Sequence, residues 1–347
     1  RTYLSHYPGR MNISWDDFMN LGKIRHNDPY EKFSMSVLAT NLSQEVNGVS
    51  KIHGRVSREM FQQMWPGYFA EENHIGYVTN GVHLPTWTDF SWQRLYREVF
   101  GKDYIDVQSD PKVWSKIDTV ADETIWNIKK ELKHRLTEYL KVKVVEDMQR
   151  RQESPSLIIN TIENFNENAL IIGFARRFAT YKRAHLLFNN IERLAELLNN
   201  PEKPVVFLFA GKAHPNDKAG QDLIKMIIET SRKKEFAGKV IFLNNYDMEL
   251  GKILTSSVDI WMNTPTRPLE ASGTSGEKAV MNGTLNLSVL DGWWAEGYRK
   301  EAGWALQEER TYSDQRYQDA GERLGKGVYG VRHNGLIAKH QELLGHG

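Results

Sequence analysis

From about residue 168 the chain alternates short, continuously apolar runs with amphipathic stretches. The apolar runs read NALIIGFAR, PVVFLFAGKA, KVIFLNNY, VDIWMNTPT and, less clearly, LNLSVLDG. The stretches between them, notably 182–200 and 217–237, carry apolar residues at helical spacing. Strands that are apolar throughout are buried on both faces. The alternation therefore predicts an α/β fold, a parallel sheet with helices on both faces.

The chain before this alternation is predicted to be largely helical. Residues 33–65 read as two helices broken near Asn47 and Gly48, and residues 112–152 carry a long helical pattern. The many charged residues of that second stretch are expected to form a solvated helix face.

Composition excludes several functional classes. The chain has 347 residues, no cysteine and a net charge of +1. We expect about two domains, no disulfides or cysteine-bound zinc, and no nucleic-acid partner. No apolar run approaches the roughly 18 residues of a membrane span, and no signal peptide is recognisable, so we expect a cytoplasmic protein without a membrane partner. Because the chain opens at Arg1 rather than Met, we expect a fragment.

Histidines give no indication of a metal site. His53, His83, His185 and His214 do not form a pair at metal-binding helical spacing, and no known carboxylate pattern flanks them. We expect structural or surface roles for them and no bound metal.

Cations gather where the first predicted strand ends. Parallel sheets bind ligands beyond the carboxyl ends of their strands, here after Phe174, Phe209, Leu243 and Met262. The segment ARRFATYKR, residues 175–183, begins at the first of these ends. Arginine binds phosphate through paired N–H groups and lysine as a point charge, so this segment predicts a phosphate site. After the second strand, Gly211 is a candidate for close backbone approach, and Lys212 is either a ligand or solvated.

The segment EASGTSGEKAV, residues 270–280, follows the fourth strand. Glycines there allow a close backbone approach to a ligand. The P-loop pattern fails because Glu277 separates Gly276 from Lys278, and GFARRF is not a dinucleotide fingerprint. A lysine beside anion donors fits a Schiff base to pyridoxal phosphate. Spacing alone leaves this chemistry as one option among several.

The motifs together resemble a known family. EASGTSGEKAVMNGTLNLSVLDG is similar to the pyridoxal-phosphate segment of the α-glucan (glycogen, starch and maltodextrin) phosphorylases. VNGVSKIHGRVSREMF, TNGVHLPTW, RRFATYKR and FAGKAHPND match the same family in the same order, from about residue 40 to about 316. GTSGEK and LDGWWAEGY resemble its short bacterial branch.

The resemblance implies a two-lobed GT-B architecture. Residues 1–85 are then the end of an incomplete N-terminal lobe, and 86–318 form the Rossmann-like C-terminal lobe that binds cofactor and phosphate. Residues 319–347 diverge from the family, consistent with a truncation or frameshift, and we expect them to be poorly ordered, most clearly over 319–335. The family's glycine-rich loop and sugar-binding histidine fall before Arg1.

The implied reaction is reversible phosphorolysis of α-1,4-glucan by inorganic phosphate, which gives glucose 1-phosphate. The resemblance assigns the cofactor to Lys278, Trp87, Arg176, Tyr246, Thr274 and Ser275. It assigns the substrate phosphate to Arg177 and Lys182, and the sugar to Asn80, Tyr181, Glu270, Ala271, Ser272 and Gly273. Asp247 departs from the pattern, since many relatives carry a basic residue there.

Two alternatives remain open at this point. One is a GT-B nucleotide-sugar glycosyltransferase similar to glycogen synthase. The other is a non-catalytic remnant that binds cofactor or glucan. The phosphorylase resemblance implies an allosteric enzyme family, a missing N-terminal lobe as partner, and a possible homo-oligomer. We expect the isolated chain to be inactive and its parent protein to be active.

Overall fold

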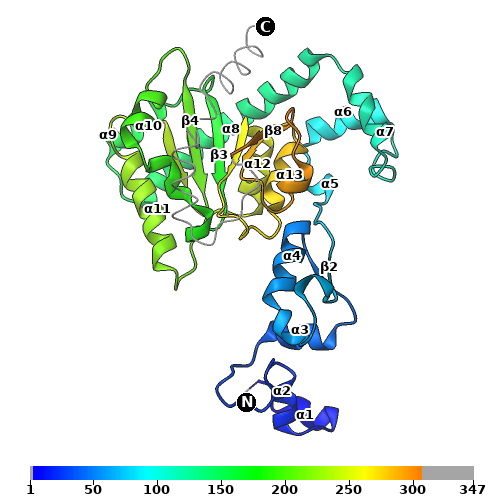
Figure 1. The fold of residues 1–347 in the computed structure, drawn as a ribbon. Coiled ribbons are helices and arrows are strands. Elements are labelled where there is room, and N and C mark those ends of the chain that lie inside the picture. Colours follow the sequence, from blue (N-terminus) through cyan, green and yellow to red (C-terminus); the bar gives the residue numbers. More distant parts are fainter. Residues whose placement is uncertain (1–2, 307–347) are drawn as a thin grey trace. The chain divides into compact units, whose positions relative to one another are not determined.

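A computed structural model describes residues 3–306 (Figure 1). The predicted tail at 319–347 lies outside the described residues. The chain divides into two compact units, Arg1–Asn80 and Gly81–Gly347. Within the described part, no helix is long and apolar enough to cross a membrane.

Short helices and one pair of strands make up the first unit. Its elements are α1 (His6–Met11), α2 (Trp15–Asn20), α3 (Met35–Leu42), β1 (Val46–Gly48), α4 (Lys51–Met60), η1 (Gln62–Met64), η2 (Ala70–Glu72) and β2 (Ile75–Tyr77). The two helices predicted within 33–65 are α3 and α4. The break between them contains β1, which pairs in parallel with β2 and was not predicted. Three residues are too short for a period to show in the sequence.

A six-stranded parallel sheet forms the centre of the second unit (Figure 1). Its order is β5 (Val240–Leu243), β4 (Val205–Ala210), β3 (Leu170–Ala175), β6 (Ile260–Asn263), β7 (Leu285–Ser288) and β8 (Gly303–Ala305). The five predicted strands are confirmed. The edge strand β8 was missed because it is short and only partly apolar.

Helices cover both faces of the sheet, as predicted. On one face, β-strand residues such as Phe207 and Phe209 pack with α10 (Ile191–Leu198) and α11 (Lys218–Ser231). On the other, Val206 and Leu208 pack with α8 (Asp122–Arg150) and α12 (Met248–Ser257). Successive strand residues face opposite sides, so a continuously apolar strand supplies both cores. The same face as α8 also contains α13 (Thr274–Val280), through Ala279.

A third apolar cluster joins the start of α8 to the elements that precede it. These are α5 (Leu84–Trp87), α6 (Phe90–Phe100), α7 (Pro111–Trp114) and η3 (Ser115–Thr119). The remaining elements are α9 (Pro155–Glu163), η4 (Thr180–Lys182), η5 (Ala184–Phe188) and α14 (Trp294–Gly297). The long helix predicted within 112–152 is confirmed as α8.

The helix predicted over 182–200 is broken into η5 and α10. Arg183 has a left-handed backbone, with φ of 50°. Its buried guanidinium donates hydrogen bonds of 2.8 Å to the carbonyls of Thr264 and Pro265. These tertiary bonds fix the loop in a conformation that local helical periodicity does not reveal.

The direction of the strand connections reverses beside β3. From β3 the chain continues to β4 and β5 on one side, then returns to β6 on the other. The connections at the carboxyl ends of β3 and β6 therefore run in opposite directions. Such a switch point is where open α/β sheets bind their ligands.

We predict that Gly211→Ala destabilises the protein by on the order of 2–4 kcal/mol. Gly211 follows β4 with φ of 152°, and an added Cβ would lie 1.9 Å from the carbonyl oxygen of Arg176. Urea unfolding measures the loss. Gly81→Ala is the control, because a Cβ there meets nothing within 4 Å. Equal stability of the two variants would show that Gly211 is not a close-approach position.

Candidate active site

A buried ionic cluster lies where β3 and β6 end. The Arg176 Nη2 atom lies 2.8 Å from Glu270 Oε2, and Lys182 Nζ pairs with the same oxygen. These three side chains are each less than one-tenth exposed. Two cations therefore share one carboxylate, which leaves a net positive charge in a buried place. A buried charge of this kind is costly unless a counter-ion compensates it.

The cluster shifts the titration of its own members. Burial, together with the nearby charge of Arg176, lowers the pKa of Lys182 to about 8. Burial alone would raise the pKa of Glu270, but Arg176 and Lys182 hold it below its ordinary value. At neutral pH the carboxylate is ionised and Lys182 keeps its proton.

Hydrogen-bond donors of the cluster remain unused within the described chain. The Nε and Nη1 atoms of Arg176 are buried without a hydrogen-bond partner, and so is the Ser272 hydroxyl. Buried donors are nearly always satisfied in folded proteins. Unused donors beside excess positive charge are the environment that an anion with several oxygens would complete.

Tyr181 and Arg177 lie around this cluster. The Lys182 amine is 4.6 Å from the centre of the Tyr181 ring. Arg177 is exposed, and its charge acts on both Lys182 and Tyr181. Arg177 forms no hydrogen bond or ion pair with another described residue. It is therefore available to a ligand at the strand ends.

Lys278 lies on α13, the short helix that follows the glycine-rich segment. Its amine is 3.5 Å from the centre of the Trp87 ring. The lysine is half-buried, and this burial lowers its pKa. In the described chain, no hydrogen bond or ion pair engages the amine. A partly desolvated, unpaired amine loses its proton more readily and becomes a nucleophile for a carbonyl group. The structure thus brings together Lys278 and Trp87.

The remaining predicted residues occupy varied positions. Gly273 is the N-cap residue just before α13, with φ of 81° and no side-chain cap hydrogen bond. Ser275 accepts a 3.1 Å hydrogen bond from the indole of Trp261, whereas Thr274 and Ala271 are half-buried. Burial raises the pKa of Tyr246, and the charge of Arg176 partly opposes that rise, which places Tyr246 near the cluster. Asn80 is exposed in the first unit.

Two aspartates on neighbouring loops have structural roles. Asp247 accepts a 2.9 Å hydrogen bond from the Leu250 N–H and caps α12, as Asp217 caps α11. Over residues 3–306, no group of three or more histidines, aspartates or glutamates is arranged to hold a metal ion.

Asp291 is a functional candidate that the sequence reasoning missed. It accepts hydrogen bonds of 2.8 Å from the Glu270 N–H and 2.9 Å from the Gly292 N–H. Burial raises its pKa to about 7. Asp291 follows β7, the fifth predicted strand, whose carboxyl end lies on the same edge of the sheet. Its place after a predicted strand, at the edge where such sheets bind ligands, is the sequence signal that points to Asp291.

Glu277, next to Lys278, is buried with no partner for its Oε2 atom. Burial raises its pKa to about 7 from an ordinary value of 4.5. Between these pH values the folded chain holds a proton that the unfolded chain has released. The free energy of unfolding therefore falls as pH rises through this window.

We predict that Glu277→Gln removes this dependence. Relative to the variant, the wild-type chain should lose on the order of 1–3 kcal/mol of stability between pH 4.5 and 7. Denaturant unfolding across that range measures it. Glu249→Gln, at an exposed position of α12, is the matched control and should track the wild type. Parallel pH curves for wild type and Glu277→Gln would contradict the assignment.

Comparison with known proteins identifies the family of the chain. A family model described as carbohydrate phosphorylase matches residues 5–300. The chain is 39% identical to the maltodextrin phosphorylase of Thermococcus litoralis over 327 residues, which cover 94% of this chain and 38% of that protein. It is also 39% identical to the glycogen phosphorylases of Aquifex aeolicus, over 91% of this chain and 44% of the relative, and Mycobacterium bovis, over 84% and 34%. The chain thus spans less than half the length of these curated relatives. By sequence and by the α/β sheet that carries its site, this chain belongs to the carbohydrate phosphorylase family.

Proposed function

We propose that this chain carries the cofactor and phosphate sites of an α-1,4-glucan phosphorylase. The reaction is the reversible attack of inorganic phosphate on the terminal glucosyl unit, which yields glucose 1-phosphate and a shortened glucan. The observation that carries the proposal is the buried cluster of Arg176 and Lys182 on Glu270, with unused donors of Arg176, at the switch point of the sheet. The family relation supports the same reaction.

The residues present fit pyridoxal phosphate. Lys278 supplies an unpaired amine beside an aromatic ring, and Arg176 and Ser272 supply buried donors that lack acceptors. We propose that Lys278 holds the cofactor and that Trp87, Arg176, Tyr246, Thr274 and Ser275 surround it. When bound, this cofactor supplies a second phosphate that donates and accepts a proton at the substrate phosphate.

The chain's own cations make such an arrangement possible. Two phosphate groups in contact repel strongly in a site of low effective dielectric. Arg177 and Lys182 are proposed to bind the substrate phosphate, and positive charge there also favours the anionic groups of the transition state. In the structure Lys182 pairs with Glu270, so Glu270 holds the amine in place until the phosphate enters.

The sugar is proposed to lie against the segment from Glu270 to Gly273, with Tyr181 and Asn80 as further contacts. Asp291 supports this segment by fixing the Glu270 backbone. The division of the chain at Asn80 and Gly81 supports assigning residues 1–85 to the end of an N-terminal lobe and 86–318 to the C-terminal lobe. A GT-B arrangement of those lobes, a cytoplasmic location and self-association belong to the same proposal.

Release of glucose 1-phosphate from maltodextrin and phosphate tests the overall reaction. We expect the full-length parent protein to release it and the 347-residue chain to bind cofactor without turnover. A parent protein that binds pyridoxal phosphate yet releases no glucose 1-phosphate would favour a role in binding alone.

We predict that Lys278→Ala abolishes the absorbance of protein-bound pyridoxal phosphate. The variant removes the amine that lies against the Trp87 ring and that we propose binds the cofactor. The chain is reconstituted with the cofactor, desalted and scanned in the near ultraviolet and visible. Lys225→Ala, at an exposed position of α11, should keep the band. Absence of the band in the wild-type chain would favour a nucleotide-sugar transferase instead.

We predict that Arg177→Ala weakens phosphate binding about 10- to 100-fold, the range expected for a charge-assisted arginine contact. The cofactor should stay bound, since Arg177 is exposed and not part of the buried ionic cluster. Titration calorimetry of phosphate into the cofactor-loaded chain measures the change. Lys225→Ala again serves as control, and an unchanged phosphate affinity in Arg177→Ala would refute the role.

A further inference from the structure

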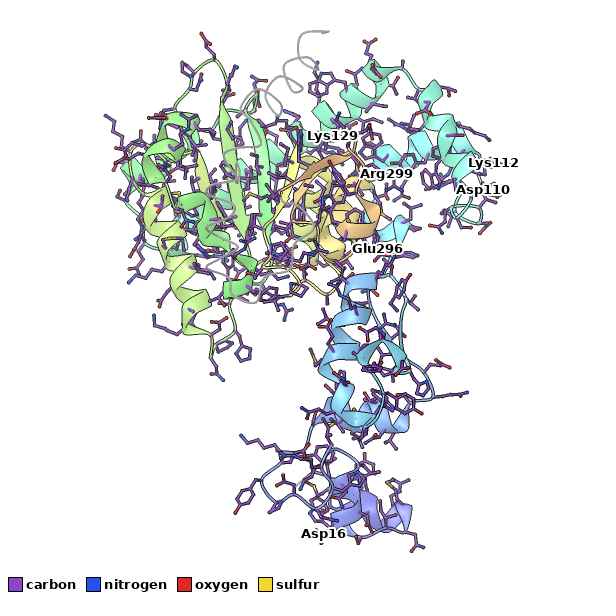
Figure 2. The ribbon with its side chains drawn as sticks, viewed as in Figure 1. Asp16, Asp110, Lys112, Lys129, Glu296 and Arg299 are labelled. Atoms are coloured by element: carbon purple, nitrogen blue, oxygen red, sulfur yellow. The ribbon has the colours of Figure 1, made fainter. Side chains whose placement is uncertain are left out.

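The segment that follows α13 is held by hydrogen bonds from side chains of two other helices. The N-terminal end of α13 has no side-chain cap. At its C-terminal end, the Tyr96 hydroxyl donates a 2.8 Å hydrogen bond to the carbonyl of Met281. Lys129, labelled in Figure 2, reaches from α8. Its amine donates to the carbonyl of Asn282 and the hydroxyl of Thr284. The helix that carries Lys278 is thus held from the segment that follows the lysine, in addition to the bonds of Glu270 and Ser275.

Asn282 is the central residue of this segment, and it is fully buried. Its Nδ2 group donates hydrogen bonds of 2.8 Å to both the Trp87 carbonyl and the Lys278 carbonyl. Its Oδ1 accepts a 2.7 Å hydrogen bond from the Asp89 N–H. Both ends of the amide are therefore satisfied, and the partners dictate its orientation. One side chain binds two segments that lie about 190 residues apart in sequence.

The Asn282 side chain supplies a hydrogen bond that the backbone of α13 lacks at the Lys278 carbonyl. The backbone N–H of Asn282 donates to Ala279 rather than to Lys278. The Lys278 carbonyl, one of the orphan acceptors at a helix end, is satisfied by the Asn282 side chain instead. The same amide group then fixes the carbonyl of Trp87. The Nδ2 atom of Asn282 is therefore hydrogen-bonded both to Lys278, which carries the amine, and to Trp87, which carries the ring.

Lys129 holds the backbone of Asn282 by a hydrogen bond to its carbonyl. Its buried amine also donates to the carbonyls of Ser256 and Val258, at 3.2 and 3.0 Å. A cation at the carbonyl ends of α12 and of the turn after α13 is favoured by the helix dipoles. It leaves the Asn282 backbone little freedom to move.

We propose that Asn282 is a positioning residue that holds the Lys278 amine against the Trp87 ring and so prepares it for the cofactor. Only the second part, that the amine is prepared for the cofactor, rests on the proposed function. The amine lies 3.5 Å from the ring centre, and a displacement of either backbone by a fraction of that distance would break the contact. Asn282 sets the separation of the two backbones.

The test uses lysine labelled with carbon-13 at the ε position in the 347-residue chain without cofactor. The Trp87 ring current should move the Lys278 methylene resonance upfield of the other lysines, and Lys278→Arg assigns it. Asn282→Ala should lose most of that displacement. Thr284→Val is the matched control: it removes hydrogen bonds to Lys129, Thr255 and Val258 in the same turn but none to Trp87 or Lys278. Its resonance should stay displaced.

Binding of pyridoxal phosphate to the same variants gives a second measurement. Asn282→Ala should weaken it about fivefold or more, the loss expected for one hydrogen bond, and Thr284→Val by less. If the wild type takes up no cofactor, the proposed function fails, while the ring-current result still decides the position of the amine. The proposal is wrong if Asn282→Ala keeps the upfield Lys278 resonance, or if Thr284→Val loses the upfield shift to the same extent.

A measurement on the wild type covers the case in which Asn282→Ala does not fold. The Asp89 amide, bound to Asn282 Oδ1, should exchange with deuterium as slowly as the amides of β3. Exchange at the rate of exposed loop amides would overturn the proposal, because the bond would then not persist in solution.

Discussion

The pairing of two buried cations with one carboxylate is the interaction on which the site depends. Arg176 directly follows β3, and Glu270 lies in the loop after β6. The ion pair between them joins the ends of these two strands at the switch point. Lys182 adds a second positive charge to the same oxygen. Burying this excess charge opposes folding unless an anion enters. The protein thus keeps a region of positive potential where we propose that phosphate groups bind.

The amine of Lys278 depends on a different kind of support. The glycine-rich segment before it lets the chain turn, and the segment after it is held by hydrogen bonds of Asn282 and Lys129. Burial lowers the pKa of the amine, and the charge of Glu277 partly opposes that shift. The ionic cluster and the lysine helix are connected by the short segment from Glu270 to Gly273. A movement of that segment would affect both.

Much of the fold could be predicted from the sequence because the signals are local. Continuous apolar runs and helical spacing located five strands, α8 and α11. Short elements without a full period, β1 and β8, gave no signal. The break before α10 depends on the buried guanidinium of Arg183, whose acceptors lie about 80 residues away. No local pattern encodes such a partner.

For the site, the sequence by itself determined which chemistry gathers at the strand ends: cations after β3, and a lysine after the glycine-rich segment following β6. Motif order also determined the family. Only the tertiary structure decided the pairing of Arg176 and Lys182 with one carboxylate, the contact of Lys278 with Trp87, and the supporting roles of Asp291 and Asn282. The reason is physical: residue type and spacing are properties of one segment, whereas burial and hydrogen-bond partners arise when distant segments pack together.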